Sequence, residues 1–245
     1  MSSQPRNPLV SQEVAALRAQ LTAFLNSPDQ SGRIPTNAQC GVYVFYDYDG
    51  EPIYVGQTYE RLRLRIRRHL TNQRTDAVAM NVLDPFEVAE IEIYPFYELE
   101  RQAGESAGSF RRRVQPILAS AEYTVFQQVL SASELGAVLN EKDIDPAPLI
   151  ALPPAHRGRI IPDEFWELRK HPDVRIARRA STVANLARVI AERGNVSSGL
   201  RRTLLVQARR IERLAAQRLD EVAGAGASDL SRQLGQSSED DDEDA

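Results

Sequence analysis

Two short runs rich in Val, Ile, Tyr and Phe lie on either side of Asp49-Gly50. An Asp-Gly pair readily adopts the positive backbone angles of a tight turn, so the pattern predicts a β-hairpin with these two residues as its loop. The expected cross-strand pairs are Tyr48 with Glu51, Tyr46 with Ile53, Phe45 with Tyr54, and Tyr43 with Gly56. Side chains alternate between faces, so Tyr43 and Tyr54 should share one face, either as ordinary sheet tyrosines or as part of a site. Gly56 is expected to leave space for a ligand opposite Tyr43.

The stretch that follows predicts a helix with one hydrophobic edge and one cationic edge. Hydrophobic residues recur at helical spacing from Leu62 to Leu70, and Arg61, Arg65 and His69 fall at intervals of four on the adjacent face. A guanidinium group can donate two parallel hydrogen bonds to a phosphate, which suits this edge to phosphate binding. A solvated surface or a loose nucleic-acid patch would use the same residue types.

Period-two and helical patterns place further elements along the chain. Residues 11–26 predict a helix, residues 86–95 a third strand, and Pro116 the first turn of a long helix. Two more helices are expected at 182–193 and 200–222. The sequence therefore predicts an α+β fold. In it a small mixed sheet, built from the hairpin, a helix and the third strand, is flanked by helices and carries helical extensions at both ends.

One carboxylate interrupts the hydrophobic face of the helix predicted from Pro116. Glu122 lies four residues from both Leu118 and Phe126. A carboxylate among buried side chains is costly unless a cation compensates it. A structural salt bridge to an arginine would provide that cation. A divalent metal is the alternative, and an oxygen ligand suits Mg²⁺ or Mn²⁺.

Three short segments follow one another in the chain: Gly41-Val42-Tyr43, Tyr54-Val55-Gly56, and the run from Leu62 to His69 with its Leu-Arg-x-Arg-hydrophobic-x-x-His pattern. Taken together in this order, they resemble the motifs of the GIY-YIG nuclease superfamily. The two isoleucine-to-valine changes conserve volume and involve no reactive group. The resemblance extends from about residue 41 to residue 140 and implies a metal-dependent DNA endonuclease.

The resemblance also implies a role for each matching residue. The matching catalytic positions are Tyr43, Tyr54, Arg65, His69, Glu122 and Asn140. Tyr43 would act as the general base, with Tyr54 hydrogen-bonding beside it. Arg65 would bind the scissile phosphate and His69 would orient the water or Tyr43, while Glu122 would hold Mg²⁺, or Mn²⁺ in its place. Asn140 matches the asparagine of the family, and a helix C-cap is its structural alternative.

Further arginines are candidates for contacts with the DNA backbone. They are Arg61, Arg63, Arg68, Arg111, Arg112 and Arg113. Each phosphate that they neutralise would release counterions and make binding sensitive to salt. For the triplet at 111–113, an exposed loop is the alternative interpretation.

The formal net charge of −4 is concentrated at one end of the chain. The run 239–244 holds six acids, and without it the remaining chain is slightly basic. An acidic tail is usually a disordered solubilising segment, and mimicry of nucleic acid is the alternative. Cys40 is alone, so no internal disulfide can form, and no hydrophobic run reaches membrane-spanning length. A cytoplasmic protein with no membrane contact is therefore expected.

The patterns divide the chain into four expected regions. They are an N-terminal helical arm at 1–37, a nuclease core at 38–142, a partly helical C-terminal extension at 143–230, and a disordered acidic tail at 231–245. Basic residues around Trp166 and at 175–179 are expected to contact DNA. The extension could pack on the core, dimerise or read bases, and its two histidines lack neighbours at metal-ligand spacing.

Two stretches narrow the expected class of nuclease. Residues 75–85 and 159–166 look similar to type II restriction endonucleases built on this fold. That similarity implies a homodimer on double-stranded DNA, with one active site for each strand, and a cognate DNA methyltransferase in the same system. A repair or mobile-element endonuclease of the same fold is the first alternative. A DNA-binding protein that does not cleave is the second.

Overall fold

The computed structural model describes residues 12–70, 84–140 and 143–223. The acidic tail predicted at 231–245 and most of the stretch 75–85 lie outside the described residues. The helices are α1 (Gln12–Asn26), α2 (Leu62–Leu70), α4 (Ala107–Ala132), α5 (Asp163–Lys170), α6 (Pro172–Arg193) and α7 (Ser198–Ala223). The strands are β1 (Gly41–Tyr46), β2 (Pro52–Thr58), β3 (Glu90–Pro95) and β4 (His156–Arg159).

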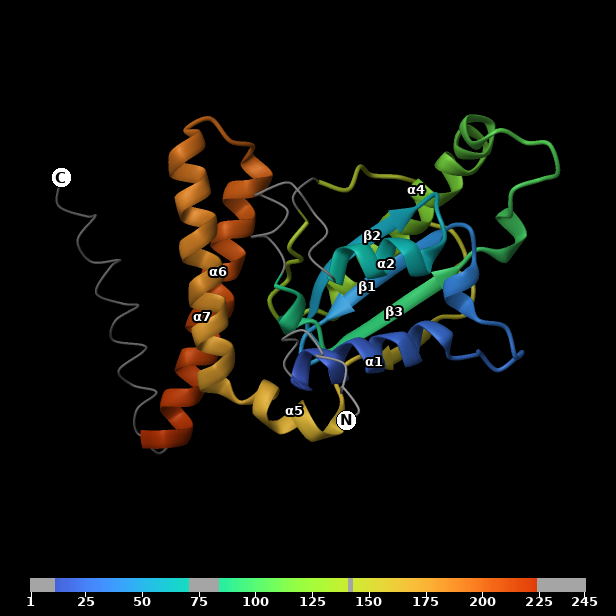
Figure 1. Ribbon diagram of the computed structural model, residues 1–245. Helices are drawn as coiled ribbons and strands as arrows, with labels where there is room; N and C mark the ends of the chain where they lie inside the picture. The colour runs from blue at the N-terminus through green and yellow to red at the C-terminus, as the bar shows by residue number, and fades with distance from the viewer. Residues whose placement is uncertain (1–11, 71–83, 141–142, 224–245) are drawn as a thin grey trace, which may run out of the picture.

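The four strands form one antiparallel sheet in the order β2-β1-β3-β4. In Figure 1, α1 and α2 lie on one face of the sheet, α4 lies on the other, and α6 and α7 stand together at one end. Alternate residues of β1 enter two separate hydrophobic clusters, with Tyr43 and Phe45 on the α1–α2 side and Val42 and Val44 on the α4 side. The predicted α+β fold is confirmed, but the sheet is antiparallel throughout and not mixed.

Strand β4 was not predicted from the sequence. Its four residues, His156-Arg-Gly-Arg159, alternate between half-buried and exposed positions but contain no hydrophobic side chain. Gly158 packs beneath Phe24 of α1, where an added Cβ would lie 2.8 Å from the ring. A hydrophobic period-two pattern therefore could not reveal this edge strand, because close backbone packing and edge arginines define it.

The hairpin has the predicted pairing in its centre and a different turn. Tyr43 opposes Gly56, as expected, but a bulge shifts the register so that Tyr46 opposes Pro52. The loop contains three residues, because the Asp47 N–H donates to the Glu51 carbonyl at 3.0 Å and the Gly50 N–H to the Asp47 carbonyl at 3.1 Å. The Asp47 carboxylate accepts two further backbone N–H groups and so fixes this wider turn.

Helix α4 begins at Ala107, nine residues before the predicted start at Pro116. The Ser106 hydroxyl caps it by accepting the Ser109 N–H at 3.1 Å, and Phe110 and Val114 extend the buried stripe. Pro116 lies inside the helix, where it removes one backbone donor. The arginine triplet 111–113 is therefore helical and does not form an exposed loop.

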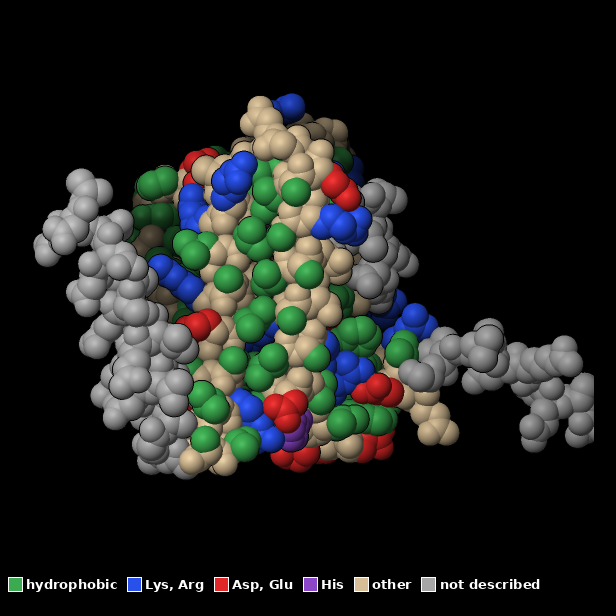
Figure 2. Space-filling view, turned by 90° about the vertical axis from the view of Figure 1, so that its left-hand side faces the viewer, with side chains coloured by type: hydrophobic (Ala, Val, Ile, Leu, Met, Phe, Trp, Pro, Cys, Tyr) green, Lys and Arg blue, Asp and Glu red, His purple; other side chains and the backbone are tan. Residues whose placement is uncertain are grey.

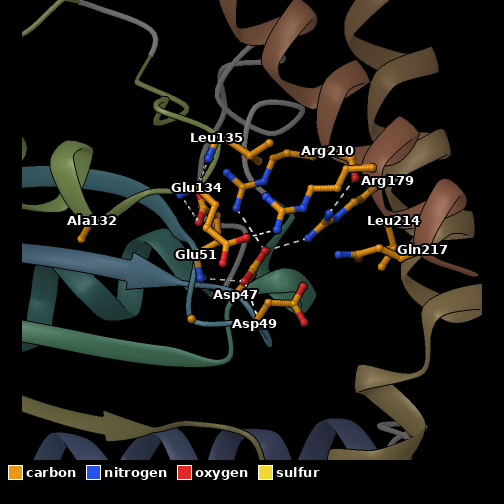
Figure 3. A pocket seen from close by; sticks show the side chains of 12 residues that line it. Asp47, Asp49, Glu51, Ala132, Glu134, Leu135, Arg179, Arg210, Leu214 and Gln217 are labelled. Atoms are coloured by element: carbon orange, nitrogen blue, oxygen red, sulfur yellow. Dashed lines mark hydrogen bonds and ion pairs between the residues drawn. The ribbon is translucent and has the colours of Figure 1, made fainter. Parts of the chain in front are cut away.

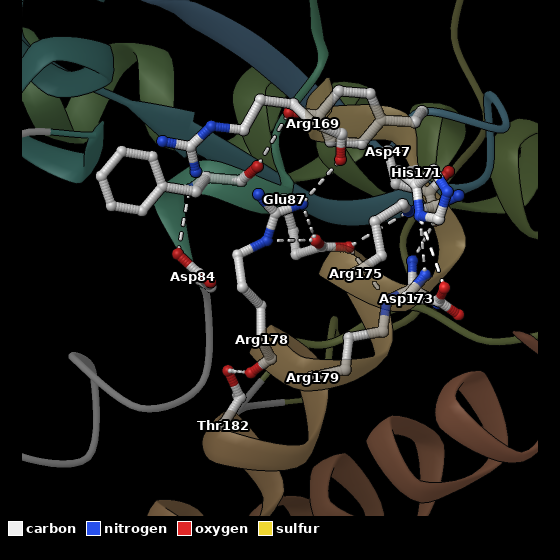
Figure 4. Close-up of polar contacts among 12 residues, drawn as sticks. Asp47, Asp84, Glu87, Arg169, His171, Asp173, Arg175, Arg178, Arg179 and Thr182 are labelled. Atoms are coloured by element: carbon white, nitrogen blue, oxygen red, sulfur yellow. Dashed lines mark hydrogen bonds and ion pairs between the residues drawn. The ribbon is translucent and has the colours of Figure 1, made fainter. Parts of the chain in front are cut away.

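A buried ion network joins α6 to the hairpin turn and to the segment before β3 (Figure 4), and it also includes Arg210 of α7. The Asp47 carboxylate accepts hydrogen bonds from Arg175, Arg179 and Arg210 at 3.3, 2.8 and 3.1 Å. Glu87 accepts from Arg179 at 2.9 Å. The side chains of Arg175 and Arg210 are 1% and 2% exposed. The expectation that the basic residues at 175–179 contact DNA is therefore wrong for Arg175 and Arg179, which neutralise buried acids.

A cavity of about 320 Å³ lies between the hairpin turn and α7. Figure 3 shows Asp47, Arg179 and Arg210 converging at one side of it. Glu51 accepts the backbone N–H groups of Glu134 and Leu135, so the segment after α4 is also tied to the turn. The network and these bonds hold the turn after β1 from two directions.

Candidate functional site

Tyr43 and Tyr54 lie on the same face of the hairpin, with ring centroids 6.1 Å apart. Gly56 permits this packing, because a Cβ at that position would lie 2.7 Å from the Tyr43 hydroxyl and 2.7 Å from a Tyr54 ring carbon. The expectation that Gly56 leaves space for a ligand is wrong. The two phenol rings fill that space, and the glycine lets them lie against the backbone of β2.

Helix α2 brings a guanidinium and an imidazole to the Tyr43 hydroxyl. Arg65 Nε donates to this hydroxyl at 3.2 Å, and His69 Nε2 lies 3.2 Å from it. Leu62 and Ile66 are fully buried and hold the helix in this orientation. Burial alone would lower the pKa of Arg65, but the neighbouring Tyr43 and Tyr54 raise the pKa above its ordinary value.

The phenol hydroxyl of Tyr43 is therefore enclosed by groups that stabilise negative charge. Tyr43 is fully buried and His69 is 4% exposed. The His69 ring also contacts Tyr54, with centroids 5.4 Å apart. A phenol with a pKa of about 10 acts as a base only when a neighbouring cation stabilises the phenolate, and Arg65 is such a cation.

Glu122 reaches the same region from helix α4 across the outer edge of β2. Burial raises the pKa of its carboxyl to about 7, and hydrogen bonds from Gln57 and the charge of Arg65 oppose that rise. The carboxylate is thus desolvated, and the cation whose charge opposes the rise of its pKa is Arg65, the candidate for phosphate binding. The geometry brings Tyr43, Arg65 and His69 together, and Glu122 lies near enough to Arg65 for the two charges to interact.

The residues around Glu122 suit a magnesium ion, which needs few protein ligands, better than a metal that is coordinated by protein side chains alone. Among the described residues, no group of three or more His, Cys, Asp or Glu side chains could hold a metal. Mg²⁺ commonly retains several waters and uses one or two carboxylates together with substrate phosphate oxygens. Glu122, which forms no ion pair with a side chain in the described part of the chain, could provide one such ligand, and a bound cation would offset the cost of burying its charge.

Asn140 lies on the same outer edge of β2. Its side chain donates to the Val55 carbonyl at 2.7 Å and accepts the Val55 N–H at 3.2 Å. The backbone N–H of the preceding residue, Leu139, donates to the Ile53 carbonyl at 2.7 Å. Asn140 does not cap a helix, since α4 ends at Ala132. The Asn140 side chain thus makes the two hydrogen bonds that the backbone of a neighbouring strand would make with Val55, the residue after Tyr54.

Two residues near Glu122 were missed by sequence reasoning, Gln57 and Tyr59. The Tyr59 hydroxyl donates to Gln57 Oε1 at 3.2 Å, which leaves the Gln57 amide nitrogen to face Glu122. The Arg111 guanidinium lies 4.9 Å from the Tyr59 ring centroid. Residues 55 and 57 are two apart in β2, so their backbone groups point to the same edge of the strand, and the Val55 N–H points to the outer edge. This spacing was the only indication in the sequence that Gln57 belongs to the site, and its use required knowing that β2 is an edge strand.

The arginines proposed for DNA contact fall into two groups. Arg63 donates to the Leu25 carbonyl at 2.9 Å, while Arg68 and Arg113 form ion pairs with nearby glutamates. These three hold the fold together locally. The exposed members are Arg61, Arg111 and Arg112.

Comparison with known proteins gives one family match. A family model described as the GIY-YIG catalytic domain matches residues 39–103, which include Tyr43, Tyr54, Arg65 and His69. No curated protein and no solved structure matches the chain significantly. The match supports the superfamily to which the motifs pointed. None of the described helices is long and apolar enough to cross a membrane.

Proposed function

We propose that this protein is a metal-dependent endonuclease that hydrolyses phosphodiester bonds in double-stranded DNA. The observation that carries the proposal is the Tyr43 hydroxyl, which lies 3.2 Å from both Arg65 Nε and His69 Nε2. The match of residues 39–103 to a GIY-YIG catalytic domain supports the same activity. Hydrolysis needs a deprotonated water and neutralised phosphate charge, and these side chains supply both functions.

Each residue has a proposed step in the reaction. Tyr43 accepts a proton from the attacking water, and the Arg65 guanidinium stabilises the phenolate that promotes this transfer. Arg65 also donates hydrogen bonds to the scissile phosphate, whose negative charge grows in the transition state. His69 orients the water or the Tyr43 hydroxyl, and Tyr54 hydrogen-bonds beside it.

Glu122 is the proposed ligand of one Mg²⁺ ion, with Mn²⁺ as a substitute. When bound, the ion would act as a Lewis acid on a phosphate oxygen and stabilise the leaving group. Gln57 holds the Glu122 carboxylate through hydrogen bonds. Asn140 has a positioning role, because its amide fixes the β2 backbone next to Tyr54.

The finer assignment is a type II restriction endonuclease that works as a homodimer alongside a cognate DNA methyltransferase. Its support is the similarity of residues 75–85 and 159–166 to that branch. A two-fold dimer would place one site on each strand of a palindromic target.

A cleavage assay tests both levels of the proposal. The protein is incubated with plasmid and phage DNA, with Mg²⁺ or with EDTA. Discrete fragments only with Mg²⁺ support a restriction enzyme, whereas nicking or structure-dependent cutting supports a repair enzyme and overturns the finer assignment. A mobility shift without cleavage would overturn the nuclease proposal.

The variant Tyr43→Phe retains the buried ring and removes the hydroxyl that contacts Arg65 and His69. We expect at least a 100-fold loss of cleavage rate with DNA binding retained, because general-base catalysis contributes roughly 10²–10⁴-fold. Tyr123→Phe removes a tyrosine hydroxyl from α4 and serves as the control, with cleavage unchanged. Full activity of the Tyr43 variant would exclude the phenol as base.

A further inference from the structure

The outer face of the α6–α7 pair carries a continuous hydrophobic strip. Figure 2 shows hydrophobic side chains running along and between the two helices, with most charged side chains at the margins. On α7 three of them are large and exposed: Leu205 at 52%, Leu219 at 43% and Val222 at 69%. Single exposed hydrophobic residues are ordinary, whereas a continuous strip of them indicates an interaction surface.

A regular repeat follows the strip on α7. Its members are separated by three and four residues in alternation and all are exposed; five are hydrophobic and the third is a glutamate: Leu205, Ala208, Glu212, Ala215, Leu219 and Val222. This 3–4 spacing is the seam of a helix that packs against another helix. The opposite side of α7 already packs against the protein through Leu200, Val206 and Leu214, so the repeat is not needed for the fold of a single chain.

Small residues on α6 continue the same face. They are Ala177, Ala180, Ala184 and Ala191, all exposed. In helical projection these alanines lie next to the side of α6 that packs against α7. The six-residue repeat of α7, here called the α7 seam, likewise lies next to the side of α7 that packs against α6. Alanine at these positions allows another helix to approach closely. The two helices thus present one surface to a single partner.

We infer that this face, defined by the α7 seam and the four α6 alanines, docks onto the same face of a second copy of the chain. The α7 seam is complementary to itself when two copies run antiparallel. In that register Leu205 lies opposite Val222, Ala208 opposite Leu219, and Glu212 opposite Ala215, so each larger side chain meets a smaller or similar one. A two-fold axis requires such self-complementarity.

Charge selects the antiparallel orientation. The N-terminal half of α7 exposes Arg201, Arg202 and Arg209, and its last turns expose Asp220 and Glu221. Parallel pairing would bring like charges together at both ends, whereas antiparallel pairing brings the basic half of each helix towards the acidic end of its partner.

The size of the face suits a stable dimer. A helix of 26 residues is roughly 39 Å long, and two helices lie about 10 Å apart. Each helix is about 10 Å wide with its side chains, so the pair is roughly 20 Å wide and offers on the order of 700 Å² per copy, near the roughly 800 Å² per partner of a standard stable interface.

The oligomeric state in solution tests the inference without reference to catalysis. We expect the full-length protein to be a dimer at about 10 µM by light scattering after gel filtration, and Leu205→Glu/Leu219→Glu to be a monomer with unchanged helical content. Leu149→Glu, which alters a leucine that is 66% exposed outside this face, should remain a dimer. Monomeric wild-type protein, or a dimer that survives the double substitution, would overturn the inference.

A second variant tests the same face in case the double substitution prevents folding. Ala184→Trp adds a large side chain at an exposed position, so it should fold normally and shift the dimer dissociation constant upwards by at least tenfold. An unchanged constant would count against close packing of the α6 face. Because these readouts need no DNA, a failed cleavage assay would leave them intact, and loss of the dimer would leave the nuclease proposal standing.

Crosslinking tests the orientation. The chain has one cysteine, Cys40, which is buried, so an added surface cysteine reacts alone. Antiparallel pairing places the two copies of residue 212 about 10 Å apart and the two copies of residue 201 roughly 35–40 Å apart. A short bis-maleimide should therefore crosslink Glu212→Cys and not Arg201→Cys. Efficient crosslinking at both positions would indicate a parallel pair and overturn the antiparallel register.

Discussion

Glu122 is the residue whose environment differs most from that of an ordinary surface glutamate. Burial raises the pKa of its carboxyl from 4.5 to about 7, despite hydrogen bonds from Gln57 and the charge of Arg65. The folded protein therefore binds a proton that the unfolded chain releases. Below pH 4.5 the carboxyl is protonated in both states and does not change the free energy of unfolding. As pH rises from 4.5 to 7 the buried group lowers the free energy of unfolding increasingly, and above pH 7 this loss is complete.

Glu122→Gln should accordingly stabilise the metal-free protein at high pH only. We expect the free energy of unfolding in EDTA to rise by roughly 1–3 kcal/mol at pH 8 and to stay unchanged at pH 4, because glutamine resembles the neutral acid. Urea denaturation at both pH values measures this. The control is Glu164→Gln, on an exposed glutamate of α5, which should show no such dependence. Equal effects at both pH values would contradict the raised pKa.

Gln57 should affect metal binding indirectly, by holding the Glu122 carboxylate in place. Its amide oxygen accepts from Tyr59 and its amide nitrogen faces the carboxylate. We expect Gln57→Leu to weaken binding of Mn²⁺, followed by electron paramagnetic resonance, by roughly 10–100-fold, the usual effect of losing a partner of a metal ligand. Gln128→Leu, on an exposed glutamine of α4, should leave Mn²⁺ affinity unchanged. Equal Mn²⁺ affinity in the Gln57 variant would remove its positioning role.

Among the elements, β2 is unusual because its outer edge is closed by side chains and not by another strand. Asn140 pairs with both backbone groups of Val55, and Glu122 lies against Gln57 two residues further along. The edge is thus both a structural boundary and a wall of the candidate site.

Removal of the Asn140 amide should loosen that edge. Asn140→Ala leaves the Val55 N–H and carbonyl without partners, which costs roughly 1–3 kcal/mol of stability. Urea unfolding measures the loss, and hydrogen exchange at Val55 should accelerate. Asn185→Ala, on an exposed asparagine of α6, should change stability little. A neutral result at Asn140 would mean that water replaces the amide without cost.

The sequence predicted those elements whose pattern is local. The faces of Tyr43 and Tyr54 follow from strand alternation, and the positions of Arg65 and His69 follow from helical spacing, so no distant contact was needed. Strand β4 lacks a hydrophobic pattern and forms only because β3 offers an edge. Arg175 and Arg179 were assigned to a DNA surface because arginine is usually exposed, and the acids that neutralise them lie more than 80 residues earlier in the chain.

At the scale of the whole molecule, the ion network around Asp47 joins the sheet to α6 and α7. Burial raises the pKa of Asp47, but Arg210, Arg175 and Arg179 outweigh it, so the pKa is lowered overall. A lowered pKa means that Asp47 stabilises the fold above the ordinary pKa of an aspartate, and that this contribution is lost as pH falls through the lowered value.

Asp47→Asn should destabilise the whole molecule. The change leaves three buried guanidinium groups without their shared counter-charge, which typically costs 3–5 kcal/mol. Thermal and urea unfolding near pH 7 measure the loss. Asp163→Asn breaks the exposed pair with Arg159 at 3.0 Å and should cost about 0–1 kcal/mol. Similar losses in both variants would argue against a special role of the buried network.

The turn that carries Asp47 directly follows β1, the strand that carries Tyr43. Three arginines from α6 and α7 satisfy this one carboxylate, so a shortened protein ending before α6 would retain the acid and lose these three cations. The candidate site consequently depends on the distant helices α6 and α7. Anyone grafting residues 39–103 onto another scaffold would have to transplant the distant helical pair as well, or redesign position 47 first.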